Sequence, residues 1–223
     1  MPPSPAARAP DAVARRLASI GRRFYQRAWV LGTSGNFSAV ISRDPLSLAI
    51  TPSGAHKGAL TAKEILAVGD DGQVIGSRQG RPSAETALHL AIARSRPAGA
   101  VLHTHSVWGT ILSESHASAR GLVLEGYEML KGLDGVTSHV HREWVPIVDN
   151  DQDMSRLALE VRDLLVSESR MHAFLIRGHG LYTWGATLDE AERHIEILEF
   201  LFETVGTRGQ YGDRHDSGAG RTD

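Results

Sequence analysis

Short apolar segments alternate with segments of helical periodicity along most of this chain, and this alternation limits the folds that it can adopt. Strands are expected at residues 37–42, 46–51, 100–104, 144–148, 173–177 and 181–184. Helices are expected at residues 11–29, 83–94, 106–115, 154–167 and 187–205. Interleaved strands and helices are typical of a layered α/β domain, in which helices cover the faces of a sheet. The direction of the strands does not follow from this pattern.

The length of 223 residues fits one domain with one sizeable core. We expect residues 11–206 to form this domain. Residues 1–10 are rich in Pro and Ala, and residues 207–223 are polar and Gly-rich without periodicity. Both segments are therefore expected to be disordered tails.

Charge and cysteine content narrow the functional classes. The 24 Lys and Arg nearly balance the 26 Asp and Glu, so neither nucleic acid nor an anionic membrane is the expected partner. The chain has no Cys, so a metal site must use His and carboxylates. No stretch approaches the roughly 18 apolar residues of a membrane span. We expect a cytoplasmic protein.

The basic N-terminal segment allows one alternative location. Residues 2–27 carry six Arg and a single acidic residue, Asp11, which is also typical of organelle transit peptides. The apolar residues Val13, Leu17, Ile20 and Phe24 recur at helical spacing, which favours a basic first helix instead.

A pair of histidines follows an apolar strand at Val101-Leu102-His103-Thr104-His105. Residues i and i+2 of a strand project to the same face, so both imidazoles point the same way. Burying two neighbouring imidazoles for packing alone is unfavourable, because both rings need hydrogen-bond partners. As ligands of one metal ion, the two rings are well suited to each other. His179 follows a second apolar strand, between Gly178 and Gly180. Three His ligands with an open fourth position are typical of a catalytic zinc site.

Other histidines are weaker candidates. His139 and His141 have the same spacing but lie in a polar stretch without a leading strand. His89 and His194 lie inside expected helices, where a packing or surface role is favoured.

Two clusters of small residues are candidate phosphate loops: residues 32–38 (GTSGNFS) and residues 51–54 (TPSG), with Lys57 close behind. Small residues let backbone N–H groups approach an anion, hydroxyls add donors and Lys57 adds charge. Ser83 at the start of a helix is a third element of such a pocket. Each cluster alone is also compatible with an ordinary turn.

Two carboxylates are candidates for proton transfer. Glu85 is expected in the first turn of the helix that Ser83 caps, and Glu128 lies in GYEMLKG (126–132). From the residues alone, the role of a surface acid is favoured for both.

The motifs together, in their order along the chain, resemble the class II aldolase family. They are GTSGNFS, TPSG, PSAET (82–86), a strand ending in HTHS (103–106), and GHG leading into YTWG (178–185). The resemblance spans roughly residues 11–206. This family includes sugar-phosphate aldolases, epimerases and a dehydratase of methionine salvage. Residues 127–133, 145–150, 180–185 and 199–203 resemble the dehydratase most.

The resemblance implies a three-layer α/β/α sandwich around a largely antiparallel sheet. It also implies a homotetramer with sites near the subunit interfaces. His103, His105 and His179 would bind one Zn²⁺ per subunit, and Glu128 would be the dehydratase's acid/base residue. Glu85 occupies the position of the aldolases' acid/base carboxylate. The implied phosphate contacts are Asn36, Ser53, Gly54 and Ser83.

Two other functional classes follow from the same resemblance. One is a sugar-phosphate aldolase or a pentulose-phosphate 4-epimerase, which would use the same metal on another substrate. The other is a non-catalytic scaffold domain, as in cytoskeletal relatives of the fold. A scaffold would be expected to lose the metal ligands, so the presence of all three histidines disfavours it.

Overall fold

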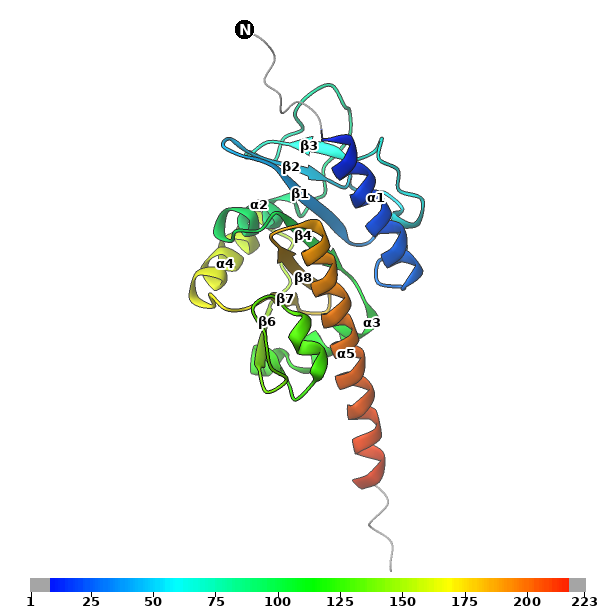
Figure 1. Ribbon diagram of the computed structural model, residues 1–223, viewed down its shortest axis with the longest axis vertical. Coiled ribbons are helices and arrows are strands. Elements are labelled where there is room, and N and C mark those ends of the chain that lie inside the picture. The colour runs from blue at the N-terminus through cyan, green and yellow to red at the C-terminus, as the bar shows by residue number, and fades with distance from the viewer. Residues whose placement is uncertain (1–8, 217–223) are drawn as a thin grey trace, which may run out of the picture.

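The computed structural model describes residues 9–216, in which the six expected strands and two further strands join into one mixed eight-stranded sheet (Figure 1). The strands are β1 (Asn36–Arg43), β2 (Leu46–Ile50), β3 (Leu66–Val68), β4 (Ala100–Thr104), β5 (Gly121–Glu125), β6 (Arg142–Val148), β7 (Ala173–Ile176) and β8 (Gly180–Gly185). Their order across the sheet is β3-β2-β1-β4-β8-β7-β6-β5. The β6–β7 pairing is parallel, and the other six pairings in this part of the chain are antiparallel.

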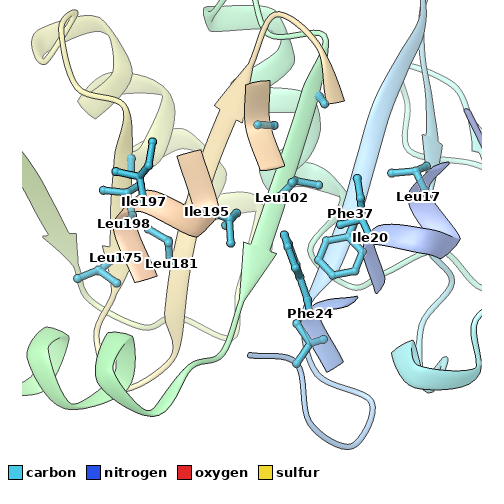
Figure 2. Packing of buried hydrophobic residues seen from close by; sticks show 14 of the residues in the cluster. Leu17, Ile20, Phe24, Phe37, Leu102, Leu175, Leu181, Ile195, Ile197 and Leu198 are labelled. Atoms are coloured by element: carbon cyan, nitrogen blue, oxygen red, sulfur yellow. The ribbon is translucent and has the colours of Figure 1, made fainter. Parts of the chain in front are cut away.

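Helices cover both faces of the sheet. They are α1 (Asp11–Gln26), α2 (Thr86–Ser95), α3 (Val107–Ser115), α4 (Met154–Ser167) and α5 (Leu188–Asp216). Residues of α1, α3 and α5 share one buried cluster with strand residues such as Phe37, Leu102 and Leu181 (Figure 2). Residues of α2 and α4 share another with Val101, Phe174 and their neighbours. Because Val101 and Leu102 are consecutive, they project to opposite faces, and the two clusters lie on opposite sides of the sheet.

The larger cluster includes Leu17, Ile20 and Phe24 of α1, at the spacing that favoured a helix there. All three are at most 1% exposed. Burying a side chain of this size contributes roughly 1.5–3 kcal/mol, so this face anchors α1 on the sheet. The basic N-terminal segment is thus a packed helix from Asp11 onward.

The structure differs from the expected elements in its two edge strands and in two helices. β3 and β5 lie outside the expected strand ranges, and they form the two edges of the sheet. The last helix was expected to end near residue 205 but continues to Asp216, past the start of the expected C-terminal tail. The second helix begins at Thr86 with Glu85 as its N-cap residue, so Ser83 does not cap it.

Residues 1–8 and 217–223, which belong to the two expected tails, lie outside the described residues. Within residues 9–216, none of the helices combines the length and the apolar character needed to cross a membrane.

Candidate active site

The three histidines singled out from the sequence converge at one edge of the sheet. His103 lies on β4, His105 directly follows this strand, and His179 lies in the tight turn between β7 and β8. Their Nε2 atoms face one another at 2.8 Å (His103–His105), 3.1 Å (His105–His179) and 3.3 Å (His103–His179). Antiparallel pairing of β4 with β8 places these strand ends together.

Backbone contacts and stacking fix the imidazoles. His103 is fully buried, its Nδ1 atom donates to the carbonyl oxygen of Leu181 at 2.9 Å, and its ring stacks on Tyr182 at 4.0 Å between centroids. The backbone N–H of His105 donates to the carbonyl of Trp29 at 2.7 Å. Because Nδ1 of His103 carries the proton, its Nε2 lone pair faces the other two rings.

Thr104 lies between the two histidines and points to the opposite side of the strand. Its hydroxyl donates to the Glu199 carboxylate on α5 at 2.6 Å. Burial raises the pKa of Glu199 to about 7. This contact fastens the histidine-bearing end of β4 to α5.

Glu85 completes the cluster. Its Oε1 atom lies 3.2 Å from Nε2 of His179, and its Oε2 atom lies 3.5 Å from Nε2 of His103. One ligand atom from each of these four residues lies within 4.8 Å of the others, which is close enough to share one metal ion. At the N-cap position of α2, the Glu85 side chain makes no capping hydrogen bond, so its carboxylate is directed toward the histidines.

The chemistry of this donor set fits a divalent cation. Burial lowers the pKa of His103 and His179 below the ordinary value, and burial together with neighbouring rings lowers the pKa of His105 to about 2. The three rings are therefore neutral near pH 7 and present lone pairs to one another. Ligand nitrogens at 2.0–2.1 Å from a tetrahedral zinc ion lie about 3.3 Å apart, close to the separations found here.

Close backbone packing at Gly180 makes this convergence possible. A Cβ atom at this position would lie 1.9 Å from the carbonyl oxygen of Thr104. We expect Gly180→Ala to destabilise the fold by about 1–3 kcal/mol or more, because the collision is with backbone. It should also weaken metal binding by separating β8 from β4.

Chemical denaturation and metal titration measure both effects. Gly209→Ala is the matched control, since a Cβ there meets nothing within 4 Å, and it should change stability by at most about 1 kcal/mol. A Gly180→Ala variant as stable as the natural chain would contradict this account of the strand packing.

A cavity of about 410 Å³ opens in front of the cluster. It has the size of many small-molecule sites. Seven predicted site residues line it together with His105: Asn36, Ser53, Gly54, Lys57, Ser83, Glu85 and His179. A bridge between Pro52 and Pro82 brings the loops that carry Ser53 and Ser83 side by side.

Lys57 lies beneath this cavity. Its ammonium group donates to the carbonyls of Thr33 (3.2 Å) and Ala55 (2.8 Å), which joins the two small-residue loops. Burial lowers the pKa of Lys57 to about 8. An ammonium has three donors, so one remains for an anion in the cavity.

Glu128 lies apart from this cavity. It belongs to the short 3-10 helix Glu128–Gly132, and its side chain is 71% exposed. The carboxylate pairs with Lys131 at 2.5 Å and with His139 at 3.8 Å. The Lys131 hydrogen bond and charge lower the pKa of Glu128. His139 and His141 are the weaker candidate ligands noted in the sequence, and His141 bonds to Glu143 at 2.7 Å.

Sequence reasoning missed several residues at the cavity and behind it. Asn150, Gln152 and Met154 line the cavity from the segment that follows β6. His89 is fully buried and bonds to Asn36, behind Glu85. A signal for His89 was available, since it follows Glu85 by four residues and such positions share a helix face.

Comparison with known proteins identifies the family. The class II aldolase and adducin N-terminal domain family matches residues 15–205. This chain belongs to that family. A protein of Marinobacter nauticus named methylthioribulose-1-phosphate dehydratase is 47% identical over 191 residues, which cover 85% of this chain and 90% of the relative.

Two solved structures have the same fold. YgbL from Klebsiella pneumoniae, a putative aldolase/epimerase/decarboxylase, has a TM-score of 0.74 at 27% identity, covering 89% of this chain and 90% of its own. An L-fuculose 1-phosphate aldolase has the same TM-score at 22% identity, covering 92% and 89%. The latter likeness concerns the fold alone.

Proposed function

We propose that this chain is a metal-dependent dehydratase of methionine salvage. Its substrate would be 5-methylthioribulose 1-phosphate, and its product 2,3-diketo-5-methylthiopentyl 1-phosphate. The observation that carries the proposal is that the histidine–Glu85 cluster opens into the same cavity that Lys57 and Ser53 line. The dehydratase of Marinobacter nauticus supports this substrate through its similarity over most of both chains.

His103, His105 and His179 would hold one Zn²⁺ ion per subunit. Neutral imidazoles suit Zn²⁺ and other borderline divalent ions, and a chain without Cys must bind such an ion through His and carboxylates. Zinc is proposed here because the resemblance to class II aldolases implies it. When bound, such an ion supplies a Lewis acid that stabilises negative charge developing on a carbonyl oxygen.

The loops around Lys57 would hold the phosphate. The hydroxyls of Ser53 and Ser83, the backbone at Gly54 and the second amide hydrogen of Asn36 all line the cavity and are donors of the required kind. Fixing the phosphate positions C3 of the sugar against the catalytic groups.

Two proton transfers complete the reaction. A base removes the proton on C3, next to the C2 ketone, and an acid protonates the C4 hydroxyl as it leaves as water. The resulting enol becomes the diketone. Glu128 and Glu85 are the proposed acid/base pair. Glu85 lines the cavity, and Glu128 resembles the acid/base residue of the dehydratase.

Glu128 does not line the cavity of its own chain, so in this proposal it acts from a second copy. The expected homotetramer, with sites near its interfaces, would allow this. The proposal also places the enzyme in the cytoplasm. It adopts the three-layer, largely antiparallel architecture implied by the resemblance, which the helix-covered faces and the strand pairings support.

A second candidate function is aldol cleavage or epimerisation of a sugar phosphate. The observation that favours it is the position of Glu85, which lines the cavity with its carboxylate 3.2 Å from His179 and can exchange a proton with a bound sugar there. Product analysis by NMR separates the candidates. The dehydratase gives a diketone, an aldolase gives two fragments, and an epimerase returns an isomeric ketose. Fragments or an isomer in place of the diketone would overturn the dehydratase proposal.

We expect substrate affinity to fall as pH rises above about 8. Burial lowers the pKa of Lys57 to about 8, so its positive charge is present below this pH and lost above it. KM should therefore rise between pH 7 and pH 9 as the attraction for the phosphate weakens. A Lys57→Met variant should have a high KM that changes little over this range. An unchanged KM in the natural chain would exclude Lys57 from phosphate binding.

A further inference from the structure

A buried chain of hydrogen bonds runs from Glu85 into the interior of the protein. Nδ2 of Asn36 donates to Oε2 of Glu85, and Oδ1 of Asn36 bonds to Nε2 of His89. Nδ1 of His89 in turn lies 2.7 Å from Oγ of Ser38. Asn36 is 5% exposed, and His89 and Ser38 are fully buried, so these hydrogen bonds are shielded from water.

Secondary structure places these groups in line. Asn36 and Ser38 are residues i and i+2 of β1, so both project to the same face, toward α2. Glu85 and His89 lie four residues apart at the start of α2. Asn36 is also the register partner of His103 on the neighbouring strand β4. The series of hydrogen bonds therefore lies directly beside the histidine cluster.

The direction of every hydrogen bond follows from its first member. A carboxylate oxygen accepts, so Asn36 must present its NH₂ group to Glu85 and its Oδ1 atom to His89. Oδ1 accepts as well, so Nε2 of His89 must carry the proton, and Nδ1 accepts from the Ser38 hydroxyl. Burial lowers the pKa of His89 to about 4, which agrees with a neutral ring that carries one proton.

We infer that His89 is a positioning residue that acts through Asn36 to hold the Glu85 carboxylate against the histidine cluster. Glu85 makes no capping bond to its own helix, and Asn36 holds its Oε2 atom while Oε1 faces His179. Without the His89 donor, the Asn36 amide can rotate and present its oxygen to the carboxylate. Two acceptors then face each other, and Glu85 leaves its place. This inference rests on the proposed function of the site.

A matched pair of variants tests it. His89→Gln keeps an N–H donor within reach of Asn36, whereas His89→Met has a similar length but no donor. His89→Met should lower kcat by roughly tenfold or more, as expected when a buried acceptor loses its partner. KM should rise as well, because the rotated Asn36 amide no longer presents its NH₂ group to the phosphate. His89→Gln should recover kcat to within a few-fold of the natural chain. His194→Met, which removes a buried histidine elsewhere, controls for a general loss of stability.

Two readouts do not depend on turnover. In substrate-free protein loaded with Co²⁺, the visible spectrum should change in His89→Met and stay close to that of the natural chain in His89→Gln and His194→Met. In the zinc-loaded natural chain, ¹⁵N NMR should find His89 as the Nε2–H tautomer. This last measurement needs no variant.

If the natural chain had no dehydratase activity, the proposed function would be overturned. The Co²⁺ spectrum of His89→Met and the tautomer of His89 would still test the positioning role of His89. An Nδ1–H tautomer, or a His89→Met variant with natural kcat and Co²⁺ spectrum, would overturn the positioning role.

Discussion

His105→Ala is expected to abolish metal binding and dehydratase activity together. The three Nε2 atoms lie 2.8–3.3 Å apart, so each imidazole would supply one of three nitrogen ligands to the same ion. Loss of one should weaken metal affinity by more than about 100-fold, since removing even an outer partner of a ligand costs 10–100-fold. Metal content after dialysis, calorimetric titration with Zn²⁺ and product formation measure the effect.

His116→Ala is the control for this experiment. His116 lies at the end of α3, outside the metal cluster, and bonds to the carbonyl of Leu112. This variant should keep both metal and activity. Full activity in a His105→Ala protein that holds no metal would contradict the assignment of the site.

Glu128→Gln is expected to lower kcat by about 10²–10⁴-fold, which is the usual contribution of a general acid or base. The variant should still bind the metal and the substrate, because Glu128 lines neither the metal cluster nor the cavity of its own chain. Single-turnover kinetics and substrate titration separate the two effects. Glu125→Gln is the matched control, since Glu125 is a similarly exposed acid nearby, paired with Arg142. A Glu128→Gln variant within a few-fold of the natural kcat would exclude Glu128 as the catalyst.

Co-assembly of the two inactive variants tests whether Glu128 acts across a subunit interface. A complex that contains both His105→Ala and Glu128→Gln chains has some sites with an intact metal cluster next to an intact Glu128 from the other chain. Partial recovery of activity is expected when the two chains are produced together with different tags. No recovery in a confirmed mixed complex would place Glu128 in its own chain's site.

The parts of the fold that follow from local patterns could be predicted. Strand-like runs at residues 100–104 and 173–177 and the α4 helix are set by short-range periodicity, and the structure has them with nearly the same bounds. The closeness of His103 and His105 follows from the two-residue period of a strand. The prediction that His179 lies beside His103 and His105 assumed that two strand ends meet at one edge of the sheet. The antiparallel pairing of β4 with β8 confirms this assumption.

Features that depend on tertiary contacts could not be predicted in the same way. Gly206 reads as a helix stop, yet α5 continues through it, because the missing side chain makes room for the ring of Trp108. β5 is a short apolar run that pairs with β6 across a 16-residue connection, so short-range periodicity does not reveal its place in the sheet. The four-residue spacing could place His89 on the helix face of Glu85, but its hydrogen bonds to Asn36 and Ser38 could not be predicted, because both partners lie on a distant strand.

Mass spectrometry of 5-methylthioribulose 1-phosphate, incubated with metal-stripped and with zinc-restored protein, tests the central claim most directly. We predict a product lighter than the substrate by one water with the zinc-restored protein, and an unchanged substrate with the metal-stripped protein. Loss of water at the same rate without metal would contradict the metal-dependent site, and an unchanged mass with zinc present would contradict the dehydratase itself.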